Sequence, residues 1–199
     1  LSNARRVSQL VLNFKQLAVD RISEARHRFD LREHFEEIIQ DLRPKLDESN
    51  VEVNIEVAPG IQMDSYPVSL AQVVTNLAVN SLQHAFEPGG RGQIFIRAEL
   101  REDDEVRIEY SDDGRGIEAV LLDRIFEPFF TTHRMIGGSG LGLYIVNQIV
   151  TRQLDGSITL EGHAERGVRF VVHIPRVARY APDVSHILAA LPRRPTNEP

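Results

Sequence analysis

The chain has 199 residues, of which 42% are hydrophobic and 26% are charged, the ordinary balance of a soluble globular protein. Its formal net charge of −6 argues against nucleic acid as a partner, because nucleic acids select basic surfaces. It has no cysteine, which excludes disulfides and thiolate metal sites, and no apolar run that approaches the roughly 20 residues needed to span a bilayer.

Residues 1–26 predict an amphipathic helix with a single apolar stripe. Its apolar residues recur at steps of three and four: Val7, Leu10, Val11, Phe14, Leu17 and Ala18. Such a stripe pairs with another helix, in the same chain or across a dimer, more often than with a membrane. We therefore expect a second helix to cover this stripe.

From Phe29 the pattern changes to alternating strands and helices. The run from Phe29 to Leu46 predicts a short strand and then a helix capped by Asp30. This helix is expected to turn four apolar side chains inward: Leu31, Phe35, Ile38 and Leu42. Residues 51–57 alternate strictly, as a half-buried strand does. A second helix is expected at about residues 68–85.

The second half of the chain predicts two hairpins separated by a glycine-rich stretch. The expected elements are a hairpin of residues 93–100 and 105–112, a short helix at 118–124, a helix at 141–154, and a hairpin of 157–163 and 168–174. The tail after Pro175 is expected to be mobile, with a short helix at 184–191. This order predicts an α+β fold, a two-layer α/β sandwich with a mixed, mainly antiparallel sheet covered by helices, rather than a doubly wound parallel sheet.

The sequence GGSGLGLYIV at residues 137–146 places Gly138, Gly140 and Gly142 at alternate positions just before a helix. Glycine lets a ligand approach main-chain N–H groups, and the helix start offers unpaired amides and its positive dipole end. The stretch therefore suits a polyphosphate, and a flexible loop before a helix is the alternative. It is not a P-loop, because no Gly-Lys-Ser/Thr follows.

The sequence DDGRGI at residues 112–117 begins at the end of an expected strand. A carboxylate in this place can accept a hydrogen bond from an exocyclic amine. The two glycines allow a flat ring to lie against the backbone. An ordinary Asp-Gly turn is the simpler alternative.

Asn76 and Asn80 stand one helical turn apart in an otherwise apolar helical run, TNLAVNSLQHA. A buried amide costs free energy unless it has a partner. The Asn80 oxygen is a suitable ligand for Mg²⁺, which binds through one or two protein oxygens plus substrate phosphates. The alternative is that both amides pair with neighbouring backbone groups.

Phe126, Phe129 and Phe130 surround a proline in the irregular stretch IFEPFFTTHR. Three phenylalanines are too many for a solvent-exposed loop. They therefore either pack beneath the domain or dock a partner.

These four segments, in this order, resemble the ATP-binding catalytic domain of sensor histidine kinases. That domain belongs to the superfamily of DNA gyrase, the mismatch-repair ATPase and a heat-shock chaperone, with a Bergerat-type ATP-binding fold. The resemblance covers residues 28–175 and implies three parts. Residues 1–27 would be the C-terminal helix of a dimerisation and histidine-phosphotransfer bundle, 28–176 the ATP-binding catalytic domain, and 177–199 a mobile tail.

The resemblance also implies roles for individual residues. Asn80 matches the Mg²⁺ ligand, Asn76 its companion near the phosphates, and Asp112 the acceptor of the adenine amine. The other residues implied in nucleotide binding are His84, Gly114, Gly116, Ile117, Thr131, Thr132, Gly138, Ser139, Gly140, Leu141, Gly142 and Leu143.

A mobile ATP lid is implied for about residues 124–139. The three phenylalanines, Phe126, Phe129 and Phe130, fall in the family's F box within it. From the same lid, His133 or Arg134 would be able to reach a phosphate.

Three features depart from the family pattern. Hydrolytic members carry a Glu where this chain has Asn76, and an amide cannot take a proton at neutral pH, which favours transfer over hydrolysis. No histidine precedes residue 27, so the phosphoacceptor is expected outside this fragment, which alone should not phosphorylate itself. Val168 replaces the usual Thr or Ser after Gly167, which puts one water-mediated contact to adenine in doubt.

The resemblance implies a protein-histidine kinase of a two-component system that uses ATP and Mg²⁺. It would donate the γ-phosphate to a histidine on a bundle helix, in cis or in trans, for transfer to an aspartate of a response-regulator receiver. The full-length protein would be a homodimer. The alternatives are a nucleotide-binding scaffold without transfer activity and a hydrolytic ATPase of the superfamily. No secretory signal opens the chain, so a cytoplasmic domain is expected, and a membrane anchor in the full-length protein stays open.

Overall fold

The computed structural model describes residues 25–87, 89–131, 139–161 and 167–178, all within one compact unit, Ala25–Tyr180. Nearly all of the helix predicted at residues 1–26, and all of the tail helix predicted at 184–191, lie outside the described residues. The expected start of the catalytic domain at residue 28 falls inside a strand, since β1 (His27–Asp30) begins one residue earlier.

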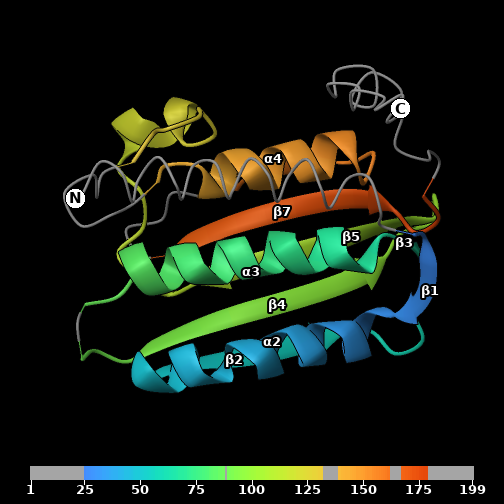
Figure 1. The fold of residues 1–199 in the computed structure, drawn as a ribbon, viewed down its shortest axis with the longest axis horizontal. Coiled ribbons are helices and arrows are strands. Elements are labelled where there is room, and N and C mark those ends of the chain that lie inside the picture. The colour runs from blue at the N-terminus through green and yellow to red at the C-terminus, as the bar shows by residue number, and fades with distance from the viewer. Residues whose placement is uncertain (1–24, 88, 132–138, 162–166, 179–199) are drawn as a thin grey trace, which may run out of the picture. The chain divides into compact units, whose positions relative to one another are not determined.

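Five strands form one mixed sheet in the order β2-β4-β5-β7-β6. Their bounds are β2 Val51–Val57, β4 Gly92–Leu100, β5 Glu105–Asp112, β7 Val168–Pro175 and β6 Ser157–Leu160. β2 and β4 run parallel, and every other neighbouring pair is antiparallel. Three helices lie side by side on one face of the sheet (Figure 1): α2 Leu31–Glu48, α3 Pro67–His84 and α4 Gly142–Arg152. The predicted two-layer α+β sandwich is confirmed.

The first of these helices forms where the sequence predicts it. The Asp30 carboxylate accepts hydrogen bonds from the backbone N–H groups of Arg32 and Glu33, at 3.0 and 3.2 Å. This pairs two of the N–H groups that a helix start leaves without a partner. The four apolar side chains expected to point inward are all buried: Leu31, Phe35, Ile38 and Leu42.

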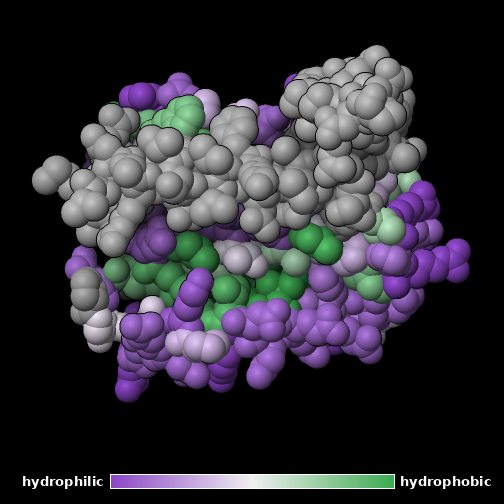
Figure 2. All heavy atoms as spheres, viewed as in Figure 1, coloured by the Kyte–Doolittle hydropathy of each residue, from purple (hydrophilic) through white to green (hydrophobic). Residues whose placement is uncertain are grey.

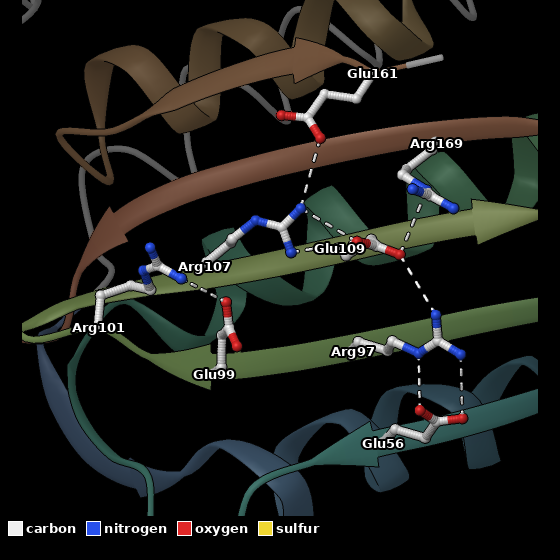
Figure 3. A network of polar contacts seen from close by, with 8 residues as sticks. All are labelled: Glu56, Arg97, Glu99, Arg101, Arg107, Glu109, Glu161 and Arg169. Carbon is white, nitrogen blue, oxygen red and sulfur yellow. Dashed lines mark hydrogen bonds and ion pairs between the residues drawn. The ribbon is translucent and has the colours of Figure 1, made fainter. Parts of the chain in front are cut away.

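The alternation of residues along the strands separates an apolar face of the sheet from a charged one. The inward side chains of the two central strands are buried: Ile94, Ile96 and Ala98 of β4, and Val106, Ile108 and Tyr110 of β5. The face turned away from the helices carries interleaved arginines and glutamates (Figure 3). Figure 2, viewed from the helix side, shows hydrophobic residues over α3 beside hydrophilic residues over α2.

A short strand, β3 (Gln62–Ser65), is not predicted by the sequence. It pairs antiparallel with β1, so that His27 lies opposite Ser65 and Asp30 opposite Gln62. Its sequence, QMDS, has no β-branched residue and therefore no local strand signal. The parallel pairing of β2 with β4 was not evident either, because it depends on the connection through β3 and α3 rather than on a local turn.

The remaining predicted elements are present with shifted ends. The β4–β5 hairpin places Ile94 opposite Asp112. β6 pairs antiparallel with β7 but ends at Leu160, and residues 162–166 lie outside the described part of the chain. The short helix predicted at 118–124 is a 3₁₀ turn, η1 (Ala119–Arg124). None of the described helices has the length and apolarity that a bilayer crossing requires.

Candidate functional site

Asp112 ends β5 on the face of the sheet that the helices cover. It is only 6% exposed, which is unusual for a carboxylate. One of its oxygens, Oδ2, lies 2.6 Å from the Ser81 hydroxyl of α3. The other, Oδ1, accepts a hydrogen bond from the Gly114 backbone N–H at 3.0 Å. The end of β5 and the last turns of α3 are therefore joined through one buried carboxylate.

Two opposing effects set the pKa of the Asp112 carboxyl. Burial disfavours the charged form and raises the pKa above its ordinary value. Hydrogen bonds from Ser81 and from the backbone N–H groups of Gly114 and Val168 oppose this rise, because they stabilise the carboxylate. Burial is the larger effect, so the pKa is raised.

The side chain of Asn80 lies against the first residue of α4. Among the described residues, its Nδ2 is buried and has no hydrogen-bond partner. A Cβ added at Gly142 would lie 2.9 Å from Oδ1 of Asn80, so only glycine lets the helix start approach the amide this closely. An unpaired buried amide costs free energy, which indicates a partner that the protein itself does not supply.

The glycine-rich segment before α4 contacts the segment that carries the phenylalanines. Gly140 has a φ of +67°, and a Cβ there would lie 2.5 Å from the backbone carbon of Phe129 and 2.8 Å from the carbonyl oxygen of Phe130. Phe129 itself has a positive φ of 65°. These two predicted motifs are therefore one packed unit, in which both backbones adopt a conformation that favours glycine.

The start of β7 closes on the loop after Asp112. The Gly167 N–H donates to the Gly114 carbonyl oxygen at 2.5 Å, and a Cβ at Gly167 would lie 2.0 Å from the Asp112 carbonyl oxygen. The next residue, Val168, lies directly opposite Asp112 in the β5–β7 pair, where its backbone N–H helps to lower the Asp112 pKa. Val168 thus contributes to the site through its main chain. This contribution does not depend on whether the side chain is Val or the Thr or Ser that the family usually has.

The structure brings residues predicted from the sequence into three separate contacts: Asn80 with Gly142, Asp112 with Gly114, and Gly140 with Phe129 and Phe130. Thr132 and Gly138 lie outside the described residues, as do His133 and Arg134. Besides Asn80, Gly114, Gly140 and Gly142, eight predicted residues are half-buried: Asn76, His84, Gly116, Ile117, Thr131, Leu143, Phe126 and Phe130. Ser139 is exposed and its hydroxyl accepts from the Leu141 N–H at 3.3 Å, while the Leu141 side chain is part of the core.

Of the three phenylalanines, two contact other side chains of the domain and one is exposed. Phe126 packs edge-on against Phe170 of β7, with ring centroids 6.3 Å apart. The Arg124 guanidinium lies over the Phe130 ring, 4.7 Å from its centroid. Phe129 is 48% exposed, so it is the one of the three whose side chain is free to meet a partner.

Sequence reasoning missed two residues of this site, Ser81 and Tyr110. The Ser81 hydroxyl lies 2.8 Å from the Tyr110 hydroxyl as well as 2.6 Å from Asp112, and all three residues are buried. Tyr110 precedes Asp112 by two positions in a strand, which puts both on one face. That spacing was the available signal, whereas nothing in the sequence indicates that Ser81 faces them.

Residues 65–178 match the protein family described as histidine kinase-, DNA gyrase B- and HSP90-like ATPases. The autoinducer 2 sensor kinase/phosphatase LuxQ of Vibrio parahaemolyticus is 33% identical in an alignment of 176 positions that covers 83% of this chain and 20% of LuxQ. The sensor protein kinase PilS of Pseudomonas aeruginosa is 32% identical in an alignment of 148 positions that covers 73% of this chain and 27% of PilS. The chain thus spans between 20% and 27% of the length of these curated relatives.

Two solved structures share the fold. The catalytic domain of the histidine kinase ThkA matches with a TM-score of 0.67 at 28% identity, over 77% of this chain and 97% of that domain. ThkA in complex with the response regulator protein TrrA matches with a TM-score of 0.68 at 26% identity, over 88% of this chain and 49% of ThkA. The motif order, the fold and these matches agree: the chain belongs to the family of histidine kinase-, DNA gyrase B- and HSP90-like ATPases.

Proposed function

We propose that the described residues form the ATP-binding catalytic domain of a sensor histidine kinase. The observation that carries the proposal is a pair of buried polar groups that can each form a further hydrogen bond to a ligand. Asp112 is a buried acceptor, and Asn80 has a buried amide nitrogen without a partner among the described residues. The amine of adenine can donate to the carboxylate, and a phosphate oxygen can accept from the Asn80 Nδ2–H.

Each group fits one part of the nucleotide. Asp112 would accept a hydrogen bond from the exocyclic amine of adenine, and the backbone at Gly114 and Gly116 would lie along the ring. Asn80 would hold Mg²⁺ through its amide oxygen, with Asn76 one turn away toward the phosphates. The described residues contain no cluster of three or more His, Cys, Asp or Glu that could hold a metal ion. This fits an ion that arrives with its phosphates, since Mg²⁺ commonly takes few protein ligands in such sites.

Phosphoryl transfer in this proposal depends mainly on positioning. Bound Mg²⁺ would supply charge neutralisation at the phosphates. The chain's own residues would hold the base at Asp112 and offer main-chain N–H groups of the 138–143 segment to the phosphates. Asn76 cannot act as a general base for water, which favours transfer to a protein side chain over hydrolysis.

The phosphoacceptor in this proposal is a histidine outside the chain, on a helical bundle that continues from residues 1–27. Two of the described histidines make contacts within the fold, which supports this placement. His34 Nε2 lies 2.9 Å from the Pro67 carbonyl oxygen, and His173 Nδ1 lies 2.6 Å from Glu105. The acceptor helix would come from the same protomer or from its partner in a homodimer.

The next acceptor in the proposal is an aspartate of a response-regulator receiver. The match to ThkA in complex with a response regulator supports this partner. The proposed limits of the catalytic domain are residues 28–176, followed by a tail at 177–199. We propose a cytoplasmic domain, and a longer protein that carries the bundle.

The test uses γ-labelled ATP with Mg²⁺, the 199-residue chain, and a histidine-bearing bundle segment from the parent protein. We expect ATP to bind, no label on the chain alone, and label on the added segment. Asp112→Asn should remove most ATP binding, because the amide keeps one acceptor oxygen where the carboxylate has two, and both oxygens of Asp112 already accept from Ser81 and Gly114. The matched control is Asp113→Asn, next in sequence but exposed, with its carboxylate on the Gln93 N–H at 2.7 Å.

Each other outcome identifies a different protein. Rapid release of free phosphate without labelled protein would show a hydrolytic ATPase and a wrong interpretation of Asn76. ATP binding with neither label nor free phosphate would indicate a nucleotide-binding scaffold. Unchanged ATP binding by Asp112→Asn would contradict the placement of the base.

A further inference from the structure

Three buried polar groups, two hydroxyls and one carboxyl, form a hydrogen-bonded series next to the site proposed for adenine. Tyr110 is 2% exposed, Ser81 is 4% exposed and Asp112 is 6% exposed. The Tyr110 hydroxyl lies 2.8 Å from the Ser81 hydroxyl, which lies 2.6 Å from Oδ2 of Asp112. The three side chains come from α3 and from one face of β5, so the contact joins the helix layer to the sheet.

The direction of these hydrogen bonds follows from proton counting. An ionised carboxylate only accepts, so the Ser81 hydroxyl must donate its single proton to Asp112. Ser81 then has no proton left for Tyr110 and must accept from the Tyr110 hydroxyl. Hydrogen-bond donation therefore runs in one direction, from the Tyr110 hydroxyl to the Ser81 hydroxyl and from there to the Asp112 carboxylate. Hydrogen bonds in such a chain polarise and strengthen one another in a low-dielectric interior.

The same counting leaves room for a ligand. An ionised carboxylate has about four lone-pair positions. Among the described residues, two groups donate to Asp112: the Ser81 hydroxyl to Oδ2 and the Gly114 backbone N–H to Oδ1. Positions remain on the carboxylate, and because it carries no proton they can take only a donor. A purine with an amine at C6 offers a donor, whereas a purine with an oxygen at C6 offers an acceptor.

We propose that Ser81, supported by Tyr110, is a positioning residue that keeps Asp112 in an acceptor role and thereby sets the preference for a 6-aminopurine over a 6-oxopurine. The proposal rests on the nucleotide-binding function proposed above. It adds two residues to which the sequence motifs assign no role, and it states what they do. Neither side chain touches the nucleotide in this account; both act through the carboxylate of Asp112.

The electrostatics of the site give the proposal a pH signature. A protonated Asp112 can no longer accept from an amine, and its O–H could donate to a 6-oxo group instead. Burial raises the Asp112 pKa, and the hydrogen bond from Ser81 lowers it. Among the described residues, the other ionisable groups involved are Asp113, whose charge raises the Asp112 pKa, and Tyr110, whose own pKa is raised by burial. The strand neighbours Ile94 and Val168 carry no charge.

Loss of Ser81 should therefore move the Asp112 pKa further upward. ATP affinity falls as pH falls through that pKa, because the acceptor form is lost. In Ser81→Ala the fall should begin at a higher pH than in the parent chain. At a given pH near neutrality the variant should bind ATP about tenfold more weakly or worse, by analogy with other hydrogen bonds to buried charged groups. GTP should lose less affinity, so the ratio of ATP to GTP affinity should fall.

The experiment measures the affinities of the 199-residue chain for ATP and for GTP, each with Mg²⁺, by calorimetry from about pH 5.5 to about pH 8. The matched control is Ser69→Ala. Ser69 is also a buried serine of α3, with its hydroxyl on the Gln153 side chain at 3.0 Å, but it is 12 residues or about 18 Å along the helix from Ser81. We expect Ser69→Ala to keep the parent's ATP-to-GTP ratio and pH profile.

Tyr110→Phe provides a second test that keeps the ring in the core and removes only the hydroxyl. It should shift the pH profile in the same direction as Ser81→Ala and by a smaller amount. Carbon NMR titration of the Asp112 carboxyl in the ligand-free chain measures the pKa without any nucleotide, and both variants should raise it. Tyr110→Phe and the titration keep the proposal testable if Ser81→Ala does not fold.

The outcomes separate this proposal from the one on which it rests. If the parent chain binds ATP and Asp112→Asn does not, the nucleotide site stands. In that case, the role proposed for Ser81 and Tyr110 is wrong if Ser81→Ala and Tyr110→Phe keep the same ATP-to-GTP affinity ratio and the same pH profile as Ser69→Ala. If the parent chain itself binds no ATP, the proposed function fails, and the selectivity proposal fails with it for that separate reason.

Discussion

At the scale of a single residue, Gly142 shows how the absence of one methyl group allows a site to form. The residue begins α4, and the Asn80 amide occupies the space where a side chain would begin. Glycine is normally a poor helix residue, and replacing it by alanine usually stabilises a helix by about 0.5–1 kcal/mol. Here the closest atom would lie 2.9 Å from the new Cβ, so either Asn80 or the helix start must move.

We predict that Gly142→Ala separates stability from binding. The thermal stability of the chain should change little, because the gain in helix propensity offsets the contact with a side-chain amide. The affinity for ATP with Mg²⁺ should fall about tenfold or more, since the Asn80 amide is displaced. The measurements are a thermal melt and a calorimetric titration. Thr151→Ala, an exposed change in the same helix, is the control. Unchanged affinity in Gly142→Ala would show that the position of Asn80 does not matter for binding.

At the scale of an element, one carboxylate connects the start of α2 to the small two-stranded sheet. The Asp30 side chain caps the helix through the N–H groups of Arg32 and Glu33. Its second oxygen accepts from the Gln62 side chain of β3 at 2.8 Å. The residue that the sequence marks as a cap therefore also joins two elements, and only the tertiary structure shows the second role.

We expect Asp30→Ala to lower the free energy of unfolding by about 1 kcal/mol, the usual cost of losing a helix cap. Urea unfolding would measure the loss as a lower midpoint with an unchanged slope. The control is Asp41→Ala, an exposed aspartate further along the same helix, for which a change within about 0.5 kcal/mol is expected. Equal midpoints for the two variants would mean that water replaces the cap at no cost.

At the scale of the whole described unit, the two faces of the sheet are stabilised in different ways. The inner face is apolar and covered by helices, whereas the outer face carries a network of charged side chains centred on Glu109 (Figure 3). The Glu109 side chain is 10% exposed and lies within 3.6 Å of Arg97, 3.2 Å of Arg107 and 3.4 Å of Arg169. One nearly buried carboxylate therefore separates three guanidinium groups on three adjacent strands.

Glu109→Gln should destabilise the chain by about 1–2 kcal/mol at low salt, because three arginines lose their shared counter-charge. The difference should shrink at about 1 M salt, where the repulsion between the arginines is screened. Glu99→Gln is the control: Glu99 is 52% exposed and pairs with Arg101. A surface pair of this kind is worth at most about 1 kcal/mol. A salt-independent loss in Glu109→Gln would point to packing rather than charge.

The ends of the described unit are also tied together at this scale. The Arg26 guanidinium donates to the Asp64 carboxylate of β3 at 2.6 and 2.8 Å, and to the Ala178 carbonyl oxygen at 2.8 Å. The hydrogen bond from Arg26 lowers the pKa of the Asp64 carboxyl. Three segments that are distant in the sequence meet at this guanidinium.

The sequence by itself determined most of the elements and the chemical groups of the site. Alternation marked β2, β4, β5 and β7, and the cap at Asp30 marked the start of α2, because each is a local property of the chain. Asn80 stood out because it lies in an otherwise apolar helical run, and Asp112 because it ends an expected strand just before two glycines. The order of the motifs was enough to indicate the family, which the comparisons then confirmed.

Only the tertiary structure decided how these pieces meet. The β3 strand, the parallel β2–β4 pair and the contact of Gly167 with Asp112 are long-range, and no local periodicity encodes them. The same holds for the Ser81–Tyr110 pair behind Asp112, since a serine in a helix gives no sign of what it faces. Side-chain partners depend on how α3 is rotated against the sheet, and that rotation is set by the packing of the whole core.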